Sequence, residues 1–161
     1  MLSLLSIRGG KISMQQLIAE AKLANVNFYG TLTPKVLFIA ETVATYTTEL
    51  NVPSTDGAYL YIPKGKKLTE QTETFIYQFI HVLNPEVIVT IGKTSATYFN
   101  PDIKIMKEGG LMIAPEFDKK HGKVLCHLLN PTYFKMVPRA KESKHLANIK
   151  FYLMQRFGFG I

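Results

Sequence analysis

Two short apolar runs constrain the fold of this chain more than any other feature of its sequence. Residues 36–40 read VLFIA, and residues 87–91 read VIVTI. A strand that is covered by helices on both faces carries such a continuous apolar run, whereas a half-exposed strand alternates apolar and polar residues. The two runs therefore predict buried strands of a mostly parallel sheet.

The segments around these strands carry helix signals. Ser13 and Thr69 each suit the N-cap of a helix that precedes one of the two strands. Gly92 turns the chain into a short helix, and Pro138 suits the first turn of a last helix. The buried stripe of this last helix is predicted to consist of Leu146, Ile149, Leu153 and Phe157, with Gly158 after its end.

The alternation of strands and helices predicts one α/β domain over residues 1–161, built as a sandwich around a mostly parallel sheet. Further strands are predicted at residues 111–114 and 123–129, while residues 41–59 are predicted to be a loop. Ligand sites of such sheets lie beyond the carboxyl ends of the strands. The loops at these ends carry Glu41, Lys93 and Asn130.

The charge of the chain is distributed unevenly. The net charge is +7, yet residues 1–118 hold ten Lys and Arg against eleven Asp and Glu. Residues 119–161 hold nine Lys and Arg and a single acidic residue, Glu142. This asymmetry predicts either a surface that faces a polyanion or a solvated, lysine-rich helix.

The cysteine content limits the disulfide and metal-cluster chemistry of the chain and indicates its redox environment. Cys126 is the only cysteine, so an internal disulfide and a cysteine-held metal cluster are both excluded. A reducing, cytoplasmic setting is the simplest expectation. No apolar run approaches the roughly 20 residues that a bilayer-spanning helix needs, and no cleavage-like site follows the apolar start, so neither a membrane partner nor a signal peptide is expected.

The histidines do not predict a metal site. His81 falls on a predicted helix and His121 in a loop, while Cys126 and His127 are adjacent on a strand and should point to opposite faces. This spacing does not suit metal ligation, so no metal and no cofactor is expected.

Three segments together resemble a known family. Residues 40–44 read AETVA, residues 84–93 read NPEVIVTIGK, and residues 130–141 read NPTYFKMVPRAK. In order and spacing they resemble the uracil-DNA glycosylase superfamily, nearest its bacterial and archaeal iron–sulfur branch. That branch has Gly-Glu-x-Pro-Gly after its first motif strand, Pro-x-Val-Ile-Val-x-Leu-Gly in the middle, and His-Pro-Ser followed by Pro-Arg-Ala-Lys near the end. The resemblance covers about residues 14–157.

The resemblance implies a three-layer α/β/α sandwich with a central, mostly parallel four-stranded sheet, and a DNA glycosylase activity. It implies that Glu41 assists the sugar cation and that Asn130 contacts the departing base. A base pocket would include Thr42, Ser54 and Tyr59, with Tyr46 as another aromatic candidate. Contacts to DNA would come from Lys93, Thr132, Tyr133, Phe134, Lys135 and Arg139.

Several departures from the family pattern leave a second interpretation open. The family's histidine aligns with Asn130, and its base-stacking phenylalanine aligns with Ser54. Four cysteines hold the cluster of that branch, and a single Cys126 excludes it. The alternative is a catalytically inactive member that binds DNA or a protein partner in replication, repair or phage and host defence. An unrelated nucleotide-binding or hydrolase module is disfavoured, because neither a phosphate-binding glycine loop nor a G-x-S-x-G elbow occurs.

Each candidate residue also has a purely structural interpretation. Glu41 would then be a salt-bridge partner, Asn130 a turn initiator before proline, and Phe134 a core residue. Lys93 would begin an ordinary strand–helix turn, although free N–H groups there, with Thr94 and Ser95, also suit a phosphate. A second basic edge is predicted at Lys64, Lys66 and Lys67, or these residues form a simple solvated loop.

Overall fold

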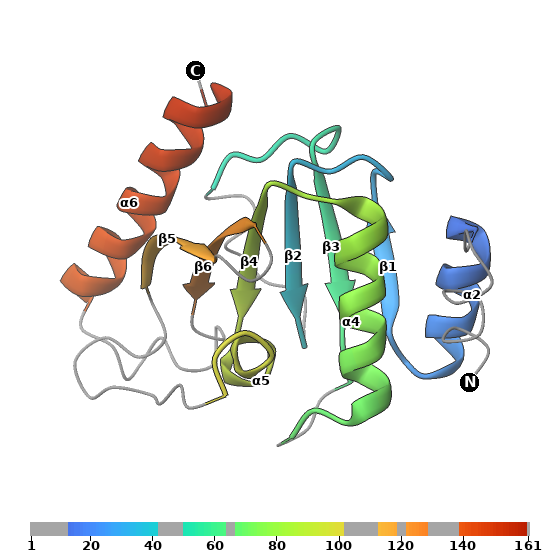
Figure 1. Ribbon diagram of the computed structural model, residues 1–161. Coiled ribbons are helices and arrows are strands. Elements are labelled where there is room, and N and C mark those ends of the chain that lie inside the picture. Colours follow the sequence, from blue (N-terminus) through green and yellow to red (C-terminus); the bar gives the residue numbers. More distant parts are fainter. Residues whose placement is uncertain are drawn as a thin grey trace.

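The computed structural model describes residues 13–41, 50–63, 67–101, 113–118, 122–128 and 139–160. Within these ranges it forms an α/β fold with helices and strands in alternation (Figure 1). In chain order the elements are α2 (Met14–Leu23), β1 (Asn27–Gly30), β2 (Val36–Ala40), β3 (Gly57–Tyr61), α4 (Glu70–Leu83), β4 (Val87–Ile91), α5 (Lys93–Thr97), β5 (Ile113–Asp118), β6 (Lys123–Leu128) and α6 (Arg139–Phe157).

The strands form one six-stranded sheet in the order β1-β3-β2-β4-β6-β5. The four inner strands, β3, β2, β4 and β6, are mutually parallel, and the edge strands β1 and β5 pair antiparallel with their neighbours. The sheet thus has two strands more than the four that the sequence predicts. The buried runs at β2 and β4 were predicted correctly, because both faces of these strands are covered and all ten of their residues are buried.

Two strands were missed in the sequence for a physical reason. β1 reads NFYG and β3 reads GAYLY, so both are short, and each has a glycine at one end. The prediction of a loop over residues 41–59 is therefore wrong where β3 begins at Gly57. β3 forms a strand because it pairs with β2. The five residues of β3 by themselves indicate this tertiary contact only weakly.

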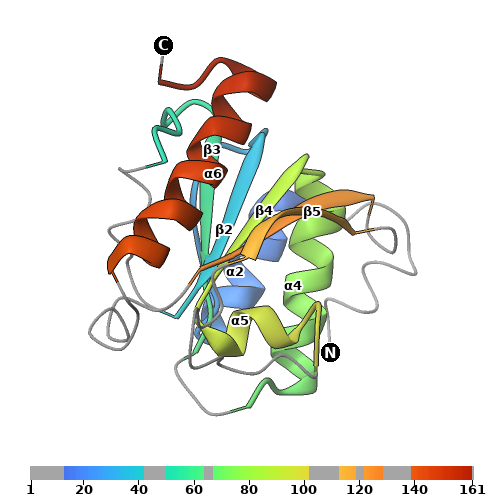
Figure 2. The ribbon, with the colours of Figure 1, turned by 90° about the vertical axis from the view of Figure 1, so that its left-hand side faces the viewer.

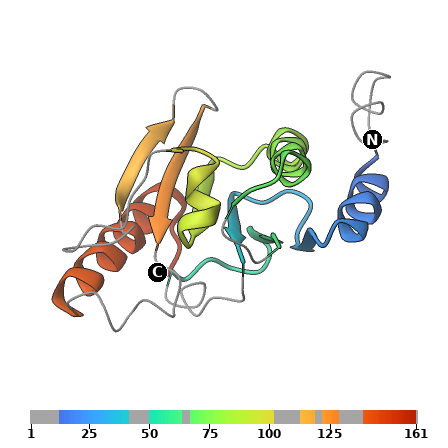
Figure 3. The same cartoon turned by 90° about the horizontal axis from the view of Figure 1, so that it is seen from below.

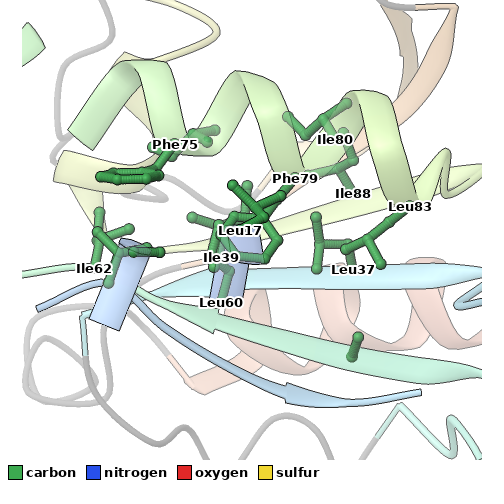
Figure 4. Packing of buried hydrophobic residues seen from close by; sticks show 14 of the residues in the cluster. Leu17, Leu37, Ile39, Leu60, Ile62, Phe75, Phe79, Ile80, Leu83 and Ile88 are labelled. Atoms are coloured by element: carbon green, nitrogen blue, oxygen red, sulfur yellow. The ribbon is translucent and has the colours of Figure 1, made fainter. Parts of the chain in front are cut away.

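Helices cover both faces of the sheet, as Figures 2 and 3 show. α2 and α4 pack on one face, called here the α4 face, and α6 packs on the opposite one, the α6 face. Along β2 the side chains alternate, so Leu37 and Ile39 face α4 whereas Phe38 faces α6. In the close view of the α4 face, apolar side chains of α4 point toward those of the strands; the labelled ones are Phe75, Phe79, Ile80 and Leu83 against Leu37, Ile39, Leu60, Ile62 and Ile88 (Figure 4).

The helix ends follow the sequence signals. The Ser13 hydroxyl accepts a hydrogen bond from the Gln16 N–H at 3.0 Å, and the Thr69 hydroxyl accepts one from the Thr72 N–H at 3.1 Å. α4 ends at Asn84, which adopts the left-handed conformation with φ of 49°. These contacts confirm both predicted N-caps and the predicted stop before Pro85.

The last helix completes the α6 face. Leu146, Ile149 and Leu153 are buried against β2, β4 and β6, as their spacing predicts, while Phe157 is partly buried. Gly158 has φ of 76°, so the chain turns there and places Phe159 back in the core at 6% exposure. The Phe157 and Phe159 rings stack with centroids 5.0 Å apart. Among the helices described, none combines the length and apolar character needed to cross a bilayer.

Candidate functional site

The carboxyl ends of the parallel strands lie side by side, and we call this line of ends the carboxyl edge. Ala40 at the end of β2 is in register with Tyr61 of β3 and with Ile91 of β4. Ile91 is in turn in register with Leu128 of β6. The Gly92 N–H donates to the Leu128 carbonyl at 2.8 Å, which continues the pairing one residue past β4. The next residues of β3, β2 and β4 therefore emerge together.

Two of the predicted site residues meet at this edge. Glu41 directly follows β2 and is half-buried, and Lys93 begins α5 directly after Gly92 and is exposed. Because β2 and β4 are neighbours in register, the two side chains leave adjacent strands at nearly the same level. The sequence prediction that these loops converge is correct for this pair.

Of the other predicted residues, some lie in the described part of the chain and the rest lie outside it. Arg139 is the first residue of α6, and that end of the helix lies at the same end of the molecule as α5 and the carboxyl edge (Figure 1). Exposed Lys67 follows the segment that leaves β3. Outside the described residues lie Thr42, Tyr46, Lys64, Lys66, His121, Asn130, Thr132, Tyr133, Phe134 and Lys135.

α5 is a single short turn of helix at the carboxyl edge. Gly92 caps it with φ of 96°, a conformation that suits glycine. The Ser95 hydroxyl is buried and donates to the Ile91 carbonyl at 3.4 Å, and the Thr97 hydroxyl donates to the Thr94 carbonyl at 2.7 Å. Ser95 therefore points back to the sheet and does not belong with Lys93 in a phosphate site.

Ser54 lies at the opposite edge of the sheet from Glu41. It belongs to the turn before β3, in which the Asp56 N–H donates to the Pro53 carbonyl at 2.9 Å. β3 is parallel to β2, with Gly57 opposite Val36, so residues before Gly57 lie at the amino ends of the strands. The length of β3, about 3.3 Å per residue, separates Ser54 from Glu41. The two residues cannot share one base pocket, and Ser54 is removed from the predicted set.

Tyr59 lies in the middle of β3 rather than at its end. Its ring stacks on Phe38, with centroids 5.1 Å apart and an interplanar angle of 19°. Tyr61, two residues later, lies on the same face at the carboxyl edge, 6.3 Å from the Tyr59 ring. The aromatic residue nearest Glu41 on β3 is thus Tyr61, which the sequence prediction missed. The alternation of Ala58 and Leu60 with the two tyrosines is the signal that could have found it.

Burial raises the pKa of the Tyr61 hydroxyl above its ordinary value of 10.0, and the neighbouring Tyr59 and Tyr29 hydroxyls raise it further. The unfolded chain loses this proton near pH 10, whereas the folded protein retains it at higher pH. The free energy of unfolding should therefore fall as the pH rises through and above about 10, because the folded state then binds more protons than the unfolded state.

Tyr61→Phe removes this contribution and leaves the other titrating groups in place. We expect wild type to lose stability relative to Tyr61→Phe as the pH rises from about 9 to about 11. Urea denaturation of both proteins at several pH values measures the difference. Parallel stability curves over this range would contradict the assigned burial of Tyr61.

A buried polar pair joins β4 and β6 one residue before the carboxyl edge. Thr90 and His127 are register partners, and the Thr90 Oγ1 atom lies 2.5 Å from His127 Nδ1. Both side chains are fully buried on the α4 face, whereas Cys126 points into the core of the α6 face. The prediction that Cys126 and His127 point to opposite faces is confirmed. Among the described residues, no three His, Cys, Asp or Glu side chains gather as metal ligands would.

Some of the basic residues hold the opposite, amino edge together. The Arg156 guanidinium makes two hydrogen bonds to the Glu86 carboxylate, at 2.5 and 2.7 Å, which raises the pKa of Arg156. The Lys123 ammonium donates to the Asn84 side chain, and burial lowers the pKa of Lys123. Lys35 lies 3.9 Å from Asp56. Two cations of the C-terminal third, Lys123 and Arg156, are therefore structural and lie away from the carboxyl edge.

Arg156→Ala tests this division of the charges. The ion pair with Glu86 is about half exposed, so we expect the free energy of unfolding to fall only slightly. Because Arg156 lies at the amino edge, the salt dependence of any DNA binding should remain that of wild type. Urea denaturation and binding titrations at several salt concentrations measure the two effects. A shallower salt slope in the variant would show that this edge contacts the polyanion.

Comparison with known proteins adds no relative from which a function could be inferred. No protein-family model matches this chain, and no curated protein matches it significantly.

Proposed function

We propose that this chain is a DNA-binding protein of the uracil-DNA glycosylase superfamily that releases an altered base by hydrolysing its N-glycosidic bond. The observation that carries the proposal is the position of Glu41 directly after β2, at the carboxyl edge of four adjacent parallel strands. The resemblance in sequence assigns a carboxylate to this point of the fold, and ligands of open α/β sheets bind beyond this edge.

In this proposal Glu41 acts on the sugar side of the reaction. The base is first turned out of the stack. Water then attacks the anomeric carbon while the N-glycosidic bond breaks, and the base leaves with the bonding electron pair. The Glu41 carboxylate orients the water, accepts its proton and stabilises the positive charge that develops on the sugar. Asn130 donates from its amide to the base oxygen on which negative charge develops.

The start of α6 suits contact with the DNA backbone. Residues 139–144 read RAKESK and hold three cations against one carboxylate, at the end of α6 that lies by the carboxyl edge (Figure 1). Cations are unfavourable at the positive amino end of a helix dipole. Their concentration at this end therefore serves an external anion better than it serves the helix, and phosphate is the anion that a DNA-directed protein meets.

A base-release assay tests the proposal. Purified protein is incubated with single- and double-stranded DNA that carries uracil, hydroxymethyluracil, hypoxanthine or a glucosylated base, and alkali-labile sites are detected on a gel. We expect strand breaks at one of these bases, and none when Glu41 is replaced. Release of every base at the rate of the protein-free control would overturn the catalytic proposal.

One observation favours a second candidate, an inactive family member that binds DNA or a protein. Ser54 lies at the amino edge, and the family's histidine is replaced by the neutral Asn130, so two groups of the family's pocket are altered in this chain. DNA binding that weakens steeply with salt, without any base release, is the expected result for a DNA-binding version. Without salt-sensitive DNA binding, only the protein-binding version would remain.

A further inference from the structure

We propose that two copies of this chain associate through β1, whose outer edge pairs antiparallel with the same edge of the second copy about a two-fold axis. β1 is the outermost strand in the order β1-β3-β2-β4-β6-β5, so no strand described here pairs with its outer edge (Figure 1). The contact uses neither Glu41 nor Lys93, and it is independent of the proposed function.

The segment that carries this edge is uncharged. Residues 23–34 read LANVNFYGTLTP and hold no Asp, Glu, Lys, Arg or His, in a chain with 19 basic and 12 acidic side chains. In a two-fold symmetric contact a side chain near the axis meets its own copy, so a charge there would oppose itself. Each chain also has a net charge of +7, which repels a second copy. An uncharged edge therefore suits a second copy, whereas a charged partner finds no ionic contact on it.

Exposed apolar side chains gather in the same segment. Among the described residues six large apolar side chains are exposed, and three of them lie here: Leu23 at 90%, Tyr29 at 57% and Leu32 at 54%. Tyr29 stands on the α6 face as the register partner of Tyr59, so α2, which packs on the α4 face, does not cover it. Single exposed apolar residues are ordinary, but a group of three within ten residues indicates an interaction surface.

The backbone of β1 directs hydrogen-bonding groups to its outer edge. The Thr31 N–H donates to the Gly57 carbonyl at 3.3 Å, so by the alternation of an antiparallel ladder Tyr29 also directs its backbone groups toward β3. Phe28, the residue before Tyr29, directs its N–H and carbonyl the other way. β1 reads NFYG and has neither the lysine nor the proline that commonly guards an exposed edge. The edge can therefore accept another strand.

A two-fold axis at Tyr29 brings the exposed apolar side chains together. Tyr29 then faces its own copy as a non-hydrogen-bonded pair, and Phe28 pairs with Gly30 of the second copy. Leu23 ends α2 before β1 begins, and Leu32 follows the end of β1, so the two leucines lie beyond opposite ends of the strand (Figure 1). Antiparallel pairing places Leu23 of each copy near Leu32 of the other. One contact thus covers all three side chains.

Sedimentation velocity of the wild-type protein, from low to high micromolar concentration, tests the association. We expect the mass to rise from that of one chain toward that of two. Because β1 has only four residues, the interface is small and the dimer weak, so this rise falls within the micromolar range. Added salt should strengthen the association, since it screens the repulsion between two chains of charge +7.

Charges placed at the axis give the sharpest test. Tyr29→Lys and Tyr29→Glu each oppose like charges and should weaken association by about tenfold or more. An equal mixture of the two variants should associate again, because lysine then faces glutamate. Tyr77→Lys is the matched control: Tyr77 is similarly exposed, at 51%, but lies on α4. Thermal unfolding shows that each variant is folded, and Leu32→Lys provides a second disruption of the contact.

A cross-link gives a readout that does not require a tight dimer. The only cysteine, Cys126, is buried, so a cysteine introduced at the surface is the reactive one. Non-hydrogen-bonded partners of an antiparallel pair have Cα atoms about 4.5 Å apart, which a disulfide can bridge. With oxidised glutathione as the oxidant, Tyr29→Cys should give a covalent dimer on a non-reducing gel, and Tyr77→Cys far less of it.

The results decide for or against pairing through β1. Association that is lost in each charged Tyr29 variant and restored in their mixture supports it, as does a cross-link specific to Tyr29→Cys. A wild-type protein that stays monomeric at every concentration would overturn it, and so would Tyr29→Lys and Tyr29→Glu variants that associate as tightly as wild type. Base release that depends on Glu41 is measured separately and can accompany either result.

Discussion

Replacing Glu41 with glutamine should lower the rate of base release by about a hundredfold to ten-thousandfold. The amide has nearly the shape of the carboxylate, but it carries no negative charge and cannot accept the proton of the attacking water. Single-turnover release from the best substrate of the panel measures the effect. Because the loss concerns the chemical step, the affinity for DNA should change much less than the rate.

Glu86→Gln provides the matched control for this variant. Glu86 is a partly exposed carboxylate directly before β4, at the amino edge of the sheet and so at the opposite edge from Glu41. It should release the base at the wild-type rate. If Glu41→Gln retained this rate as well, while its thermal unfolding matched wild type, Glu41 would have no catalytic role and the inactive-member hypothesis would gain.

Truncation of Phe79 to alanine should have the largest effect on stability. Phe79 is fully buried on α4, and its ring stacks on Phe28 of β1, with centroids 5.5 Å apart and an angle of 9°. The substitution removes this contact and leaves a cavity between α4 and the sheet, which typically costs about 3–5 kcal/mol. Domains of this size are stable by about 5–15 kcal/mol, so we expect the variant to lose a large part of its stability.

Urea denaturation measures this loss as a lower midpoint, and Tyr77→Ala is the control on the same helix. Tyr77 faces solvent and stacks only on His81 in the described part of the chain, with centroids 6.1 Å apart. Its truncation should change the free energy of unfolding by about 1 kcal/mol or less. Similar losses for Phe79→Ala and Tyr77→Ala would contradict the packing of α4 described here.

The central part of the fold could be predicted from local sequence because periodicity and burial agree there. β2 and β4 are continuous apolar runs buried on both faces, and α4 and α6 show apolar stripes whose members are buried. β1 and β3 could not be predicted with the same ease, since their strand conformation depends on pairing with partners far along the chain. Each is only four or five residues long and has a glycine at one end, so the alternation of Ala58 and Leu60 with the two tyrosines of β3 is a weak signal by itself.

In the candidate site, too, some features could be predicted from the sequence and others depend on strand pairing. The meeting of Glu41 and Lys93 follows from a general rule, since parallel strands in register end at one edge. The assignment of Ser54 came from alignment with a family motif and failed, because residues before a strand parallel to β2 must lie at the amino edge. Tyr61 was missed for the same reason, since its position at the carboxyl edge exists only once β3 is recognised as a strand.

The burial of Phe159 beside Leu153 and Phe38 has a consequence for the order in which the two layers can form during synthesis. The α4 face joins α2, α4 and β1–β4, nearly all of which precede residue 92. The α6 face needs residues 146–159, more than a hundred positions after β2, so its contacts have a high sequence separation and close late. Until these residues leave the ribosome, the apolar α6 side of β2 and β4 faces water, and the nascent chain is then most open to chaperones and to aggregation.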